Sequence, residues 1–353
     1  MNRIPKISGV AVSVPEFRVE QKTAKEFARR IFSNRTSDVD RILSVFDNSQ
    51  IDTRYFSRPL EWFEQPHTLS EKNQVYIDSS TKLCLDATQR LFKQNDISPE
   101  EIDYIIYVNT TGLATPSIDA RLINLLGLRQ NIRRIPIWGL GCAGGAAGLS
   151  HAYHHLLGHP NEKVLLIACE LCGLTFLCND YSKSNLVATA LFGEGAAAVL
   201  LASGEIESNG LEIVATNSRF FPDSLDVMGW NIIDSGLQVV FAKQIPEIIE
   251  KHALSDFTEF LKTNNLQLKD ISKFLFHPGG AKVLEAYQHA LGMSNGSLSH
   301  SAGVLRRYGN MSSVTVLFVL DEFFRNPDRK AEGYALISAL GPGFSSESLL
   351  LKL

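Results

Sequence analysis

The spacing of apolar positions divides the chain into a helical beginning and a longer alternating part. Residues 22–32, 38–46 and 69–92 carry apolar side chains three and four positions apart, which predicts three helices. From about residue 103, short apolar and β-branched runs alternate with helical stretches. The runs predict strands at 104–108, 135–138, 163–168 and 196–201. The stretches between them predict helices at 117–126, 143–157 and 185–191.

The same alternation begins again after Ser203-Gly204. It predicts strands at 211–216, 273–276, 333–340 and 348–353, and helices at 246–263, 280–291 and 312–324. Uninterrupted apolar strands between helices are typical of a sheet that is covered on both faces. We therefore expect an α/β protein made of two similar halves, residues 1–205 and 206–353. No linker-like segment separates these halves, so we expect them to pack tightly.

The composition is that of a soluble globular protein. The chain has 353 residues, of which 44% are hydrophobic and 20% charged, and this argues against a disordered or coiled-coil protein. A formal charge of −4 gives no reason to expect nucleic acid or an anionic membrane as a partner. The longest apolar stretch, residues 135–149, contains five glycines and is shorter than the roughly 20 residues that span a bilayer. We expect no membrane span.

The cysteines indicate a reducing environment. There are five, an odd number, and no apolar run resembling a secretory signal follows Met1. Free thiols, and hence a cytoplasmic protein, are the expectation.

The glycine-rich segment Gly139 to Gly145 lies between a predicted strand and a predicted helix, and two interpretations of it remain open. Gly139, Gly141 and Gly144 fit the G-x-G-x-x-G pattern of a dinucleotide site, which would indicate an NAD(P)-dependent oxidoreductase. A strained nucleophile turn centred on a cysteine is excluded, because it requires glycine where the chain has Leu140.

The second interpretation makes Cys142 a thiol nucleophile at the first turn of a buried helix. Unpaired N–H groups and the positive end of the helix dipole favour a thiolate at such a position. A buried cysteine with a purely structural role is the alternative. His277 follows the apolar run that ends at Phe276, and Asn310 precedes a predicted helix. Taken alone, His277 or Asn310 could have a purely structural role. Together with Cys142 they form a Cys/His/Asn set, which can be catalytic only if the three side chains converge in space.

These segments resemble the type III polyketide synthases, the chalcone-synthase-like branch of the thiolase superfamily. The resemblance runs through almost the whole chain and is strongest in Thr110–Pro116, Gly139–Gly145, Leu191–Ala197, His277–Gly280, Gly309–Ser313 and Gly341–Gly343. Initiating ketoacyl-synthase-type condensing enzymes share the Cys/His/Asn set and are an alternative. Their histidine is followed by Gln-Ala-Asn, whereas His277 is followed by Pro278-Gly279-Gly280, which favours the polyketide branch. A degenerate, non-catalytic thiolase-like protein is disfavoured because all three residues are present.

The resemblance implies a thiolase-like, five-layered αβαβα sandwich and an acyltransferase that needs no cofactor or metal. Its substrates would be an acyl-CoA starter and malonyl-CoA, joined by decarboxylative Claisen condensation. Cys142, His277 and Asn310 would be catalytic. The implied substrate-binding residues are Phe192, Thr175, Val239, Ser312, Trp230 and Arg41. The family members are homodimers, in which the loop corresponding to residues 111–116 reaches the partner's cavity.

The resemblance also indicates a class of starter. Phe192 matches one gating phenylalanine of the family, but the second falls near Val239, and a smaller aliphatic residue there would widen the passage and line it with apolar surface. Because each buried methylene contributes about 0.8 kcal/mol, we expect a long-chain fatty acyl-CoA starter and alkylpyrone or alkylresorcinol products. Of the basic residues that hold CoA phosphates in plant relatives, Arg41 alone is matched, with Ser44 and Asn48 at the other positions.

Two further clusters are weaker candidates. The histidines at 151, 154, 155 and 159 have a spacing that places nitrogens on one helix face, but no carboxylate or cysteine completes a metal set beside them. Cys169-x-x-Cys172 with Cys178 lacks the second ligand pair of a zinc site. We expect the histidines to be a surface feature, and one or more of the thiols to line the substrate cavity near Thr175.

Overall fold

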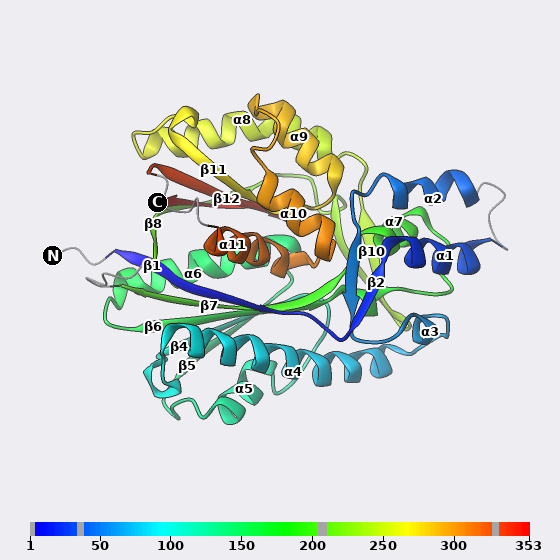
Figure 1. The fold of residues 1–353 in the computed structure, drawn as a ribbon, viewed down its shortest axis with the longest axis horizontal. Helices are drawn as coiled ribbons and strands as arrows, with labels where there is room; N and C mark the ends of the chain where they lie inside the picture. Colours follow the sequence, from blue (N-terminus) through cyan, green and yellow to red (C-terminus); the bar gives the residue numbers. More distant parts are fainter. Residues whose placement is uncertain (1–3, 34–38, 204–209, 327–331) are drawn as a thin grey trace.

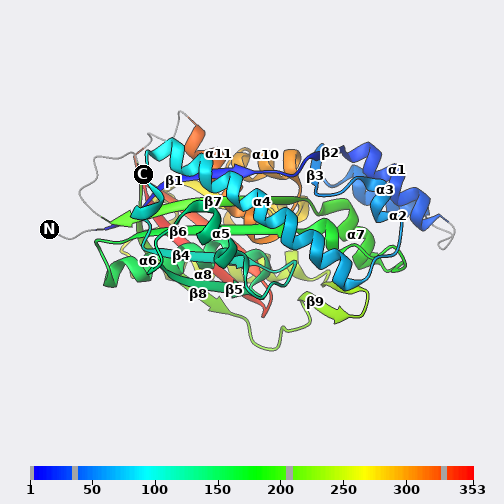
Figure 2. The same ribbon diagram turned by 90° about the horizontal axis from the view of Figure 1, so that it is seen from below.

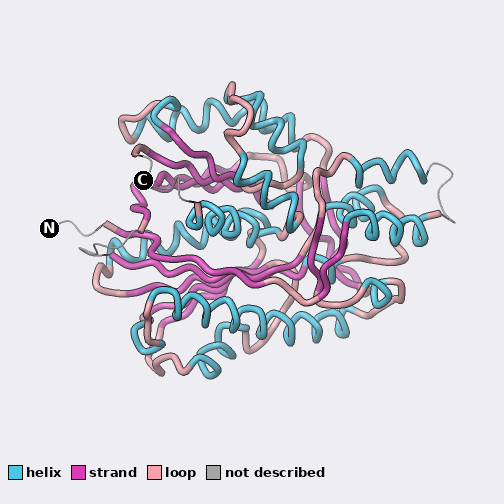
Figure 3. Tube along the Cα trace, in the orientation of Figure 1, coloured by secondary structure: helices cyan, strands magenta, loops and turns pink. Residues whose placement is uncertain are grey.

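Five alternating layers of helices and sheet make up the protein (Figure 1). The structure is a computed structural model that describes residues 4–33, 39–203, 210–326 and 332–353. In Figure 3 the strands form two bands with helices above, between and below them. The expected αβαβα sandwich is therefore confirmed. No helix in the described ranges is both long and apolar enough to cross a bilayer.

The N-terminal half supplies one sheet and its helices. Its strands are β1 (Pro5–Ser13), β4 (Tyr104–Asn109), β5 (Arg133–Trp138), β6 (Lys163–Leu171) and β7 (Glu194–Ser203). Its main helices are α4 (Leu69–Asn95), α5 (Ile118–Leu126) and α6 (Gly144–Gly158). Smaller elements gather at one end of the molecule: β2 (Phe17–Glu20), α1 (Gln21–Phe32), α2 (Val39–Asp47), β3 (Thr53–Phe56), α3 (Leu60–Phe63) and α7 (Lys183–Leu191).

The C-terminal half supplies the second sheet. Its strands are β8 (Leu211–Phe220), β11 (Ile271–Phe276), β12 (Tyr334–Gly341) and β13 (Ser345–Lys352). Its helices are α8 (Ile245–Thr263), α9 (Ala281–Leu291), α10 (Ser299–Tyr308) and α11 (Thr315–Arg325). A separate hairpin consists of β9 (Met228–Ile233) and β10 (Gly236–Phe241).

The two halves repeat one strand topology. The strand order is β11-β12-β13-β8-β1-β7-β6-β4-β5. In the first half β1 pairs antiparallel with β7, β7 pairs antiparallel with β6, and β6 pairs parallel with β4. In the second half β8 pairs antiparallel with β13, β13 pairs antiparallel with β12, and β12 pairs parallel with β11. Within the described residues, the sheets of the two halves pair at two positions, Lys6 with Glu212 and Ile7 with Leu211. The boundary expected between residues 205 and 206 lies outside the described residues.

Both faces of central strands such as β6 and β7 are buried, as their apolar sequences predict. Along β6, Leu165 and Ile167 face the layer of α4 and α5, which Figure 2 shows crossing in front of the sheet. Leu166 and Ala168 face the opposite way, into the core around α6 and α11. This alternation follows from the two-residue period of a strand, so a strand with helices on both sides must be apolar throughout.

Several elements were not expected from the pattern. Strand β1 and helix α10 fall in segments for which no element was predicted, and β3 lies inside the region expected to be mostly helical. The predicted helix 312–324 begins as a separate 3-10 turn, Ser312–Val314, before α11. Cys142 likewise lies in a 3-10 turn, Gly141–Ala143, directly ahead of α6.

The first turn of α6 makes a close approach between the halves. A Cβ on Gly145 would lie 2.2 Å from the backbone oxygen of Ser313 and 2.9 Å from Val316 Cγ1. Backbone of one half thus touches backbone of the other without an intervening side chain. Because interiors are packed at crystal-like density, this contact fixes where α6 begins relative to the turn before α11.

We expect Gly145→Ala to destabilise the protein by about 1–3 kcal/mol or more, because its Cβ would overlap a backbone atom that cannot rotate away. Gly158→Ala in the last turn of the same helix is the matched control. A Cβ there meets nothing within 4 Å, so the change should be neutral or stabilising by up to about 1 kcal/mol. Urea unfolding of both variants checks this; equal stabilities would show that the contact is not tight.

Candidate active site

Cys142 lies where the N-terminal half meets the C-terminal half. The chain leaves β5, turns through Gly139 and Gly141, both of which have positive φ, and enters α6. A Cβ on Gly141 would lie 2.5 Å from Pro342 Cδ, so this turn is covered by the C-terminal half. The Cys142 side chain is buried, and its thiol donates to Ser312 Oγ at 3.7 Å.

His277 and Asn310 come from the C-terminal half. His277 directly follows β11, and its N–H donates to the carbonyl of Ser338 at 2.8 Å, which extends the pairing of β11 with β12. Asn310 follows α10; its Oδ1 accepts from Ser312 N–H at 2.8 Å, and its Nδ2 donates to the Gly279 carbonyl at 3.1 Å. The Asn310 amide is therefore oriented by backbone groups on both sides.

The three side chains share one cavity of about 360 Å³. Most of its other lining residues are apolar, among them Leu191, Met228, Phe241, Ile245 and Leu340. Sequence reasoning depended on a sulfur from the first half meeting an imidazole and a carboxamide from the second. The structure brings them to the same cavity.

The burial of this cavity opposes charge on either titratable group. Burial raises the pKa of the Cys142 thiol to about 12, although hydrogen bonds from Ser312 and Asn310 act in the opposite direction. Burial also lowers the pKa of His277 to about 3, and neither ring nitrogen has a hydrogen-bond partner among the described residues. Both shifts favour the uncharged forms, a thiol and a neutral imidazole, over the thiolate that the helix N-terminus alone was expected to favour. A proton transferred from Cys142 to His277 would create both charges together, so that each offsets the other.

Glu170 is a buried polar residue beneath Cys142 whose structural role was not predicted from the sequence. One carboxylate oxygen accepts from the N–H groups of Thr110 and Thr111, and the other accepts from Ser313 Oγ at 2.6 Å. Burial raises the pKa of Glu170 to about 7. The residue joins the loop after β4 to the turn before α11, so it supports both sides of the site. In the sequence, the feature that could have indicated this role is that Glu170 is the one acidic residue in the apolar run of β6.

Phe192 is buried at the end of α7 and packs against aromatic residues of the β9–β10 hairpin. Its ring centroid lies 5.6 Å from that of Phe241 and 6.0 Å from that of Trp230. Val239 belongs to the same apolar cluster but is not among the residues lining the large cavity, whereas Phe241 is. Phe241 was missed from the sequence. Since it lies two positions after Val239, the two-residue strand period places both on one face.

Thr175, Cys172 and Phe192 line a second, smaller cavity of about 40 Å³. Its walls are mainly aromatic and aliphatic, including Phe56 and Phe63. Cys172 and Thr175 thus line one cavity, and the expectation that a thiol lines the substrate cavity stays a prediction. All five cysteines are free, as expected.

Arg41 is exposed on α2 and is not among the residues that line the large cavity. Asn48, just after α2, does line it, whereas Ser44 is exposed and does not. Two exposed cations, Lys243 and Lys282, line the same cavity from the C-terminal half. The structure therefore places more positive charge at this cavity than alignment with plant relatives indicates.

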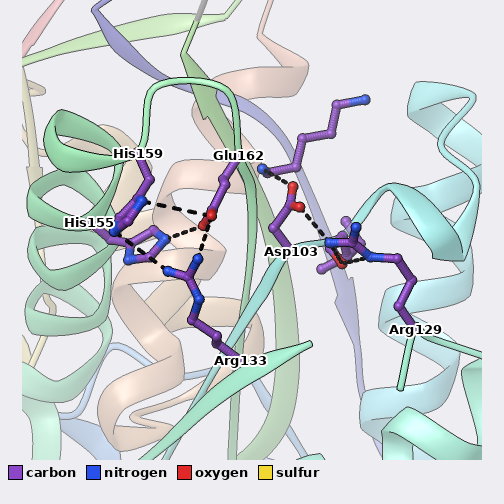
Figure 4. Close-up of polar contacts among 8 residues, drawn as sticks. Asp103, Arg129, Arg133, His155, His159 and Glu162 are labelled. Carbon is purple, nitrogen blue, oxygen red and sulfur yellow. Dashed lines mark hydrogen bonds and ion pairs between the residues drawn. The ribbon is translucent and has the colours of Figure 1, made fainter. Parts of the chain in front are cut away.

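Two of the four histidines, His155 and His159, form an ion-pair network with Glu162 and Arg133, so a carboxylate does lie beside them, contrary to expectation (Figure 4). The rings of His155 and His159 stack with centroids 4.6 Å apart, and His155 Nε2 lies 2.7 Å from Glu162. Arg133 donates to the same carboxylate at 2.7 Å. Three of the four histidines are exposed, which agrees with a surface feature. Within the described ranges, no three His, Cys, Asp or Glu side chains are grouped to hold a metal.

The glycine pattern does not leave space for a dinucleotide. Gly144 and Gly145 pack directly on Ser313, so the N-terminus of α6 is covered by protein where a pyrophosphate would have to bind. These glycines serve close packing between the halves.

Comparison with known proteins gives consistent matches over the whole chain. Residues 6–205 match the family model for the N-terminal domain of chalcone and stilbene synthases, and residues 212–353 match that for the C-terminal domain. A protein of Bacillus subtilis (strain 168) that carries a chalcone synthase name is 43% identical over 98% of this chain and 97% of its own. A 1,3,6,8-tetrahydroxynaphthalene synthase of Streptomyces peucetius subsp. caesius is 34% identical over 100% of this chain and 94% of its own.

Solved structures agree. The crystal structure of the 1,3,6,8-tetrahydroxynaphthalene synthase of Streptomyces coelicolor A3(2), a bacterial type III polyketide synthase, superposes with a TM-score of 0.93 at 27% identity. The match covers 98% of this chain and 99% of that one.

The electrostatics of the site predict how alkylation of Cys142 depends on pH. The thiolate is the reactive form, so the rate rises with pH in every variant. In His277→Gln no imidazole takes the thiol proton, so alkylation at neutral pH should slow by about tenfold or more, and the rise in rate should move to higher pH. Iodoacetamide labelling followed by peptide mapping resolves Cys142 from the four other cysteines. Identical pH profiles for wild type and variant would contradict the role of His277.

Proposed function

Because the chain belongs to the chalcone and stilbene synthase family and is a type III polyketide synthase, we propose that it starts from a long-chain fatty acyl-CoA. In this proposal it extends the starter with malonyl-CoA and closes the product to an alkylpyrone or alkylresorcinol. The observation that carries the proposal is the convergence of Cys142, His277 and Asn310 on one largely apolar cavity.

Starter loading is the first step. His277 accepts the proton of Cys142 as the sulfur attacks the acyl-CoA carbonyl, so thiolate and imidazolium arise together in the buried site. Coenzyme A leaves as a thiol after taking a proton, and the acyl group remains on Cys142. A proton acceptor without competing hydrogen bonds suits this step, and both His277 nitrogens have none within the described protein.

Decarboxylation and condensation follow. Loss of carbon dioxide from malonyl-CoA leaves negative charge on the thioester oxygen, and donors from His277 Nε2 and Asn310 Nδ2 would stabilise it. One preorganised donor of this kind is worth about 3 kcal/mol. The enolate carbon then attacks the acyl carbonyl, the bond to Cys142 sulfur breaks, and the extended chain is carried by coenzyme A.

The apolar surroundings of Phe192 support the proposed starter class. Val239 and Trp230 pack around Phe192, and the smaller cavity beside it has aromatic walls. At about 40 Å³ this cavity is smaller than a long alkyl chain, so we propose that the chain displaces these side chains as it enters. Each methylene it buries contributes about 0.8 kcal/mol, which offsets the cost of that movement.

Lys243 and Lys282 are the cations we propose for the CoA phosphates. Both are exposed and line the cavity that contains Cys142, whereas Arg41 does not. Exposed ammonium groups suit phosphate, because they remain hydrated until the ligand arrives.

We also propose a homodimer formed through β5. This strand is at the edge of the sheet, and Trp138 at its end is 43% exposed. Trp138 donates to the carbonyl of Gly112, next to Leu113, which is 47% exposed. An open strand edge with adjacent exposed apolar groups is suited to pairing with a second copy.

Sedimentation measures the mass of the particle in solution. Wild type should have the mass of two chains, and Trp138→Asp the mass of one chain. A monomeric wild type would contradict the proposed dimer.

The starter proposal is tested with a panel of acetyl-, benzoyl- and fatty acyl-CoAs together with malonyl-CoA. We expect kcat/KM to be roughly tenfold or more higher for long fatty acyl starters, and mass spectrometry to identify alkylpyrones or alkylresorcinols. Val239→Phe should lower activity with long starters by roughly tenfold, since overfilling a packed site costs about 1–3 kcal/mol. Val239→Ile is the matched control and should have little effect.

The main competing outcome is a product built from malonyl-CoA alone. The Streptomyces relatives are named 1,3,6,8-tetrahydroxynaphthalene synthases, and because such a product carries no alkyl chain from a fatty acyl starter, we propose this as the second candidate. It would be favoured if malonyl-CoA without any starter gave the highest rate. Cys142→Ala should abolish product formation under either candidate.

A further inference from the structure

The C-terminus of helix α7 is held by residues from three separate parts of the chain. A helix leaves its last carbonyl groups without partners inside the helix, and these need other donors when they are buried. The carbonyls of Thr189 and Phe192 accept from Arg54 Nη1 at 2.6 and 2.7 Å. Gln21 donates to the carbonyl of Ala190 at 2.8 Å. The N–H of Asn310 donates to the carbonyl of Leu191, also at 2.8 Å.

Arg54 is an unusual residue for such a role, since its side chain is almost fully buried at 1% exposure. Burial lowers the pKa of Arg54 to about 9, so the group still carries its charge at neutral pH. A cation is stabilised at a helix C-terminus, where carbonyl dipoles converge. Arg54 Nε and Nη2 have no hydrogen-bond partner in the described part of the chain. The hydrogen bonds of the guanidinium to described residues therefore come from Nη1 and go to the C-terminus of α7.

The strand that carries Arg54 also holds the end of α10. The N–H of Asp52 donates to the carbonyl of Arg306 at 2.7 Å, and Thr53 Oγ1 donates to the carbonyl of Arg307 at 2.8 Å. The chain then passes through Gly309, where a Cβ would lie 2.6 Å from the Leu191 carbonyl and 2.8 Å from Arg54 Cδ. Gly309 therefore fits between Arg54 and α7, and the next residue is Asn310.

Phe192 and Asn310 are thus joined on a common support. Their backbones form an isolated bridge, with Gly193 N–H donating to the Asn310 carbonyl at 2.9 Å. Arg54 contacts both sides of this bridge, through the Phe192 carbonyl on one side and Gly309 on the other. Its side chain also lines the smaller cavity with Phe192.

We propose that Arg54 is a positioning residue that sets where Phe192 and the Asn310 amide stand relative to Cys142. Arginine suits the position because one planar guanidinium directs two N–H bonds in fixed directions, which an ammonium group does not. The inference rests on the proposed function, in which Asn310 acts on malonyl-CoA. Cys142 and His277 are not contacted by Arg54, so starter loading does not depend on it.

The test separates the two half-reactions in Arg54→Met, Arg54→Lys and wild type. Intact-protein mass spectrometry measures loading of Cys142 from a fatty acyl-CoA, and release of labelled carbon dioxide measures malonyl-CoA decarboxylation. For Arg54→Met we expect loading within about twofold of wild type but decarboxylation lowered by about tenfold or more, with an altered starter-length profile. Arg54→Lys keeps the charge but lacks the planar guanidinium, and its rate of decarboxylation should lie between those of wild type and Arg54→Met.

Arg18→Met is the matched control. Arg18 lies opposite Tyr55 in the β2–β3 pair, next to Arg54, but its side chain is 55% exposed and makes a surface ion pair with Glu20. Both half-reactions should match wild type in this variant.

The possible outcomes are distinct. Equal loss of both half-reactions in Arg54→Met, in proportion to a loss of folded protein, would assign Arg54 a structural role only and overturn the proposal. Wild-type rates for both would overturn it as well. If Arg54→Met does not fold, the unequal effect on the two half-reactions must appear in Arg54→Lys, or the proposal fails. Absence of loading in wild type would instead reject the proposed function.

Discussion

The active site depends on direct backbone contact between the two halves at the start of α6. No side chain fits between Gly145 and the Ser313 carbonyl, so the two turns that carry Cys142 and Ser312 are held at a fixed spacing. In the part of the chain that the structure describes, the two sheets pair at two positions, and the helices between them make further contacts between the halves. Packing of α6 against the turn before α11 therefore determines whether sulfur, imidazole and carboxamide meet. Glu170 reinforces the contact from below by hydrogen bonding to both halves.

The same packing sets the chemistry of the site. A tight interface excludes water, and exclusion of water raises the pKa of Cys142 while it lowers that of His277. Burial disfavours charge on either group alone, so in the proposed reaction the first proton transfer occurs between them. In a site of low dielectric, the oriented amide of Asn310 would stabilise the enolate of the proposed reaction more strongly than it would in water. Exclusion of water is thus the common origin of two effects: the cost of burying polar groups and the stronger action of preorganised donors.

Much of this arrangement could be predicted from the sequence. The apolar runs at 104–108 and 163–168 and the helical periodicity at 69–92 correspond to β4, β6 and α4, because burial on both faces leaves a clear pattern. Ordered motifs identified Cys142, His277 and Asn310. The periodicity did not predict α10, and it placed β3 in a region expected to be helical. Arg54 and Phe241 have roles that depend on distant partners, which no local pattern encodes. The roles assigned to Thr175, Trp230 and Arg41 stay predictions.

The central claim is that Cys142, and no other thiol, carries the starter acyl group in a pocket shared with Asn310. The most direct measurement is peptide mapping of protein incubated with a fatty acyl-CoA, before and after a pulse of malonyl-CoA. The account predicts the acyl mass on the Cys142 peptide alone, its loss after the pulse in wild type, and its persistence in Asn310→Ala. An acyl group on Cys172, or its equally fast loss from Asn310→Ala, would contradict the account.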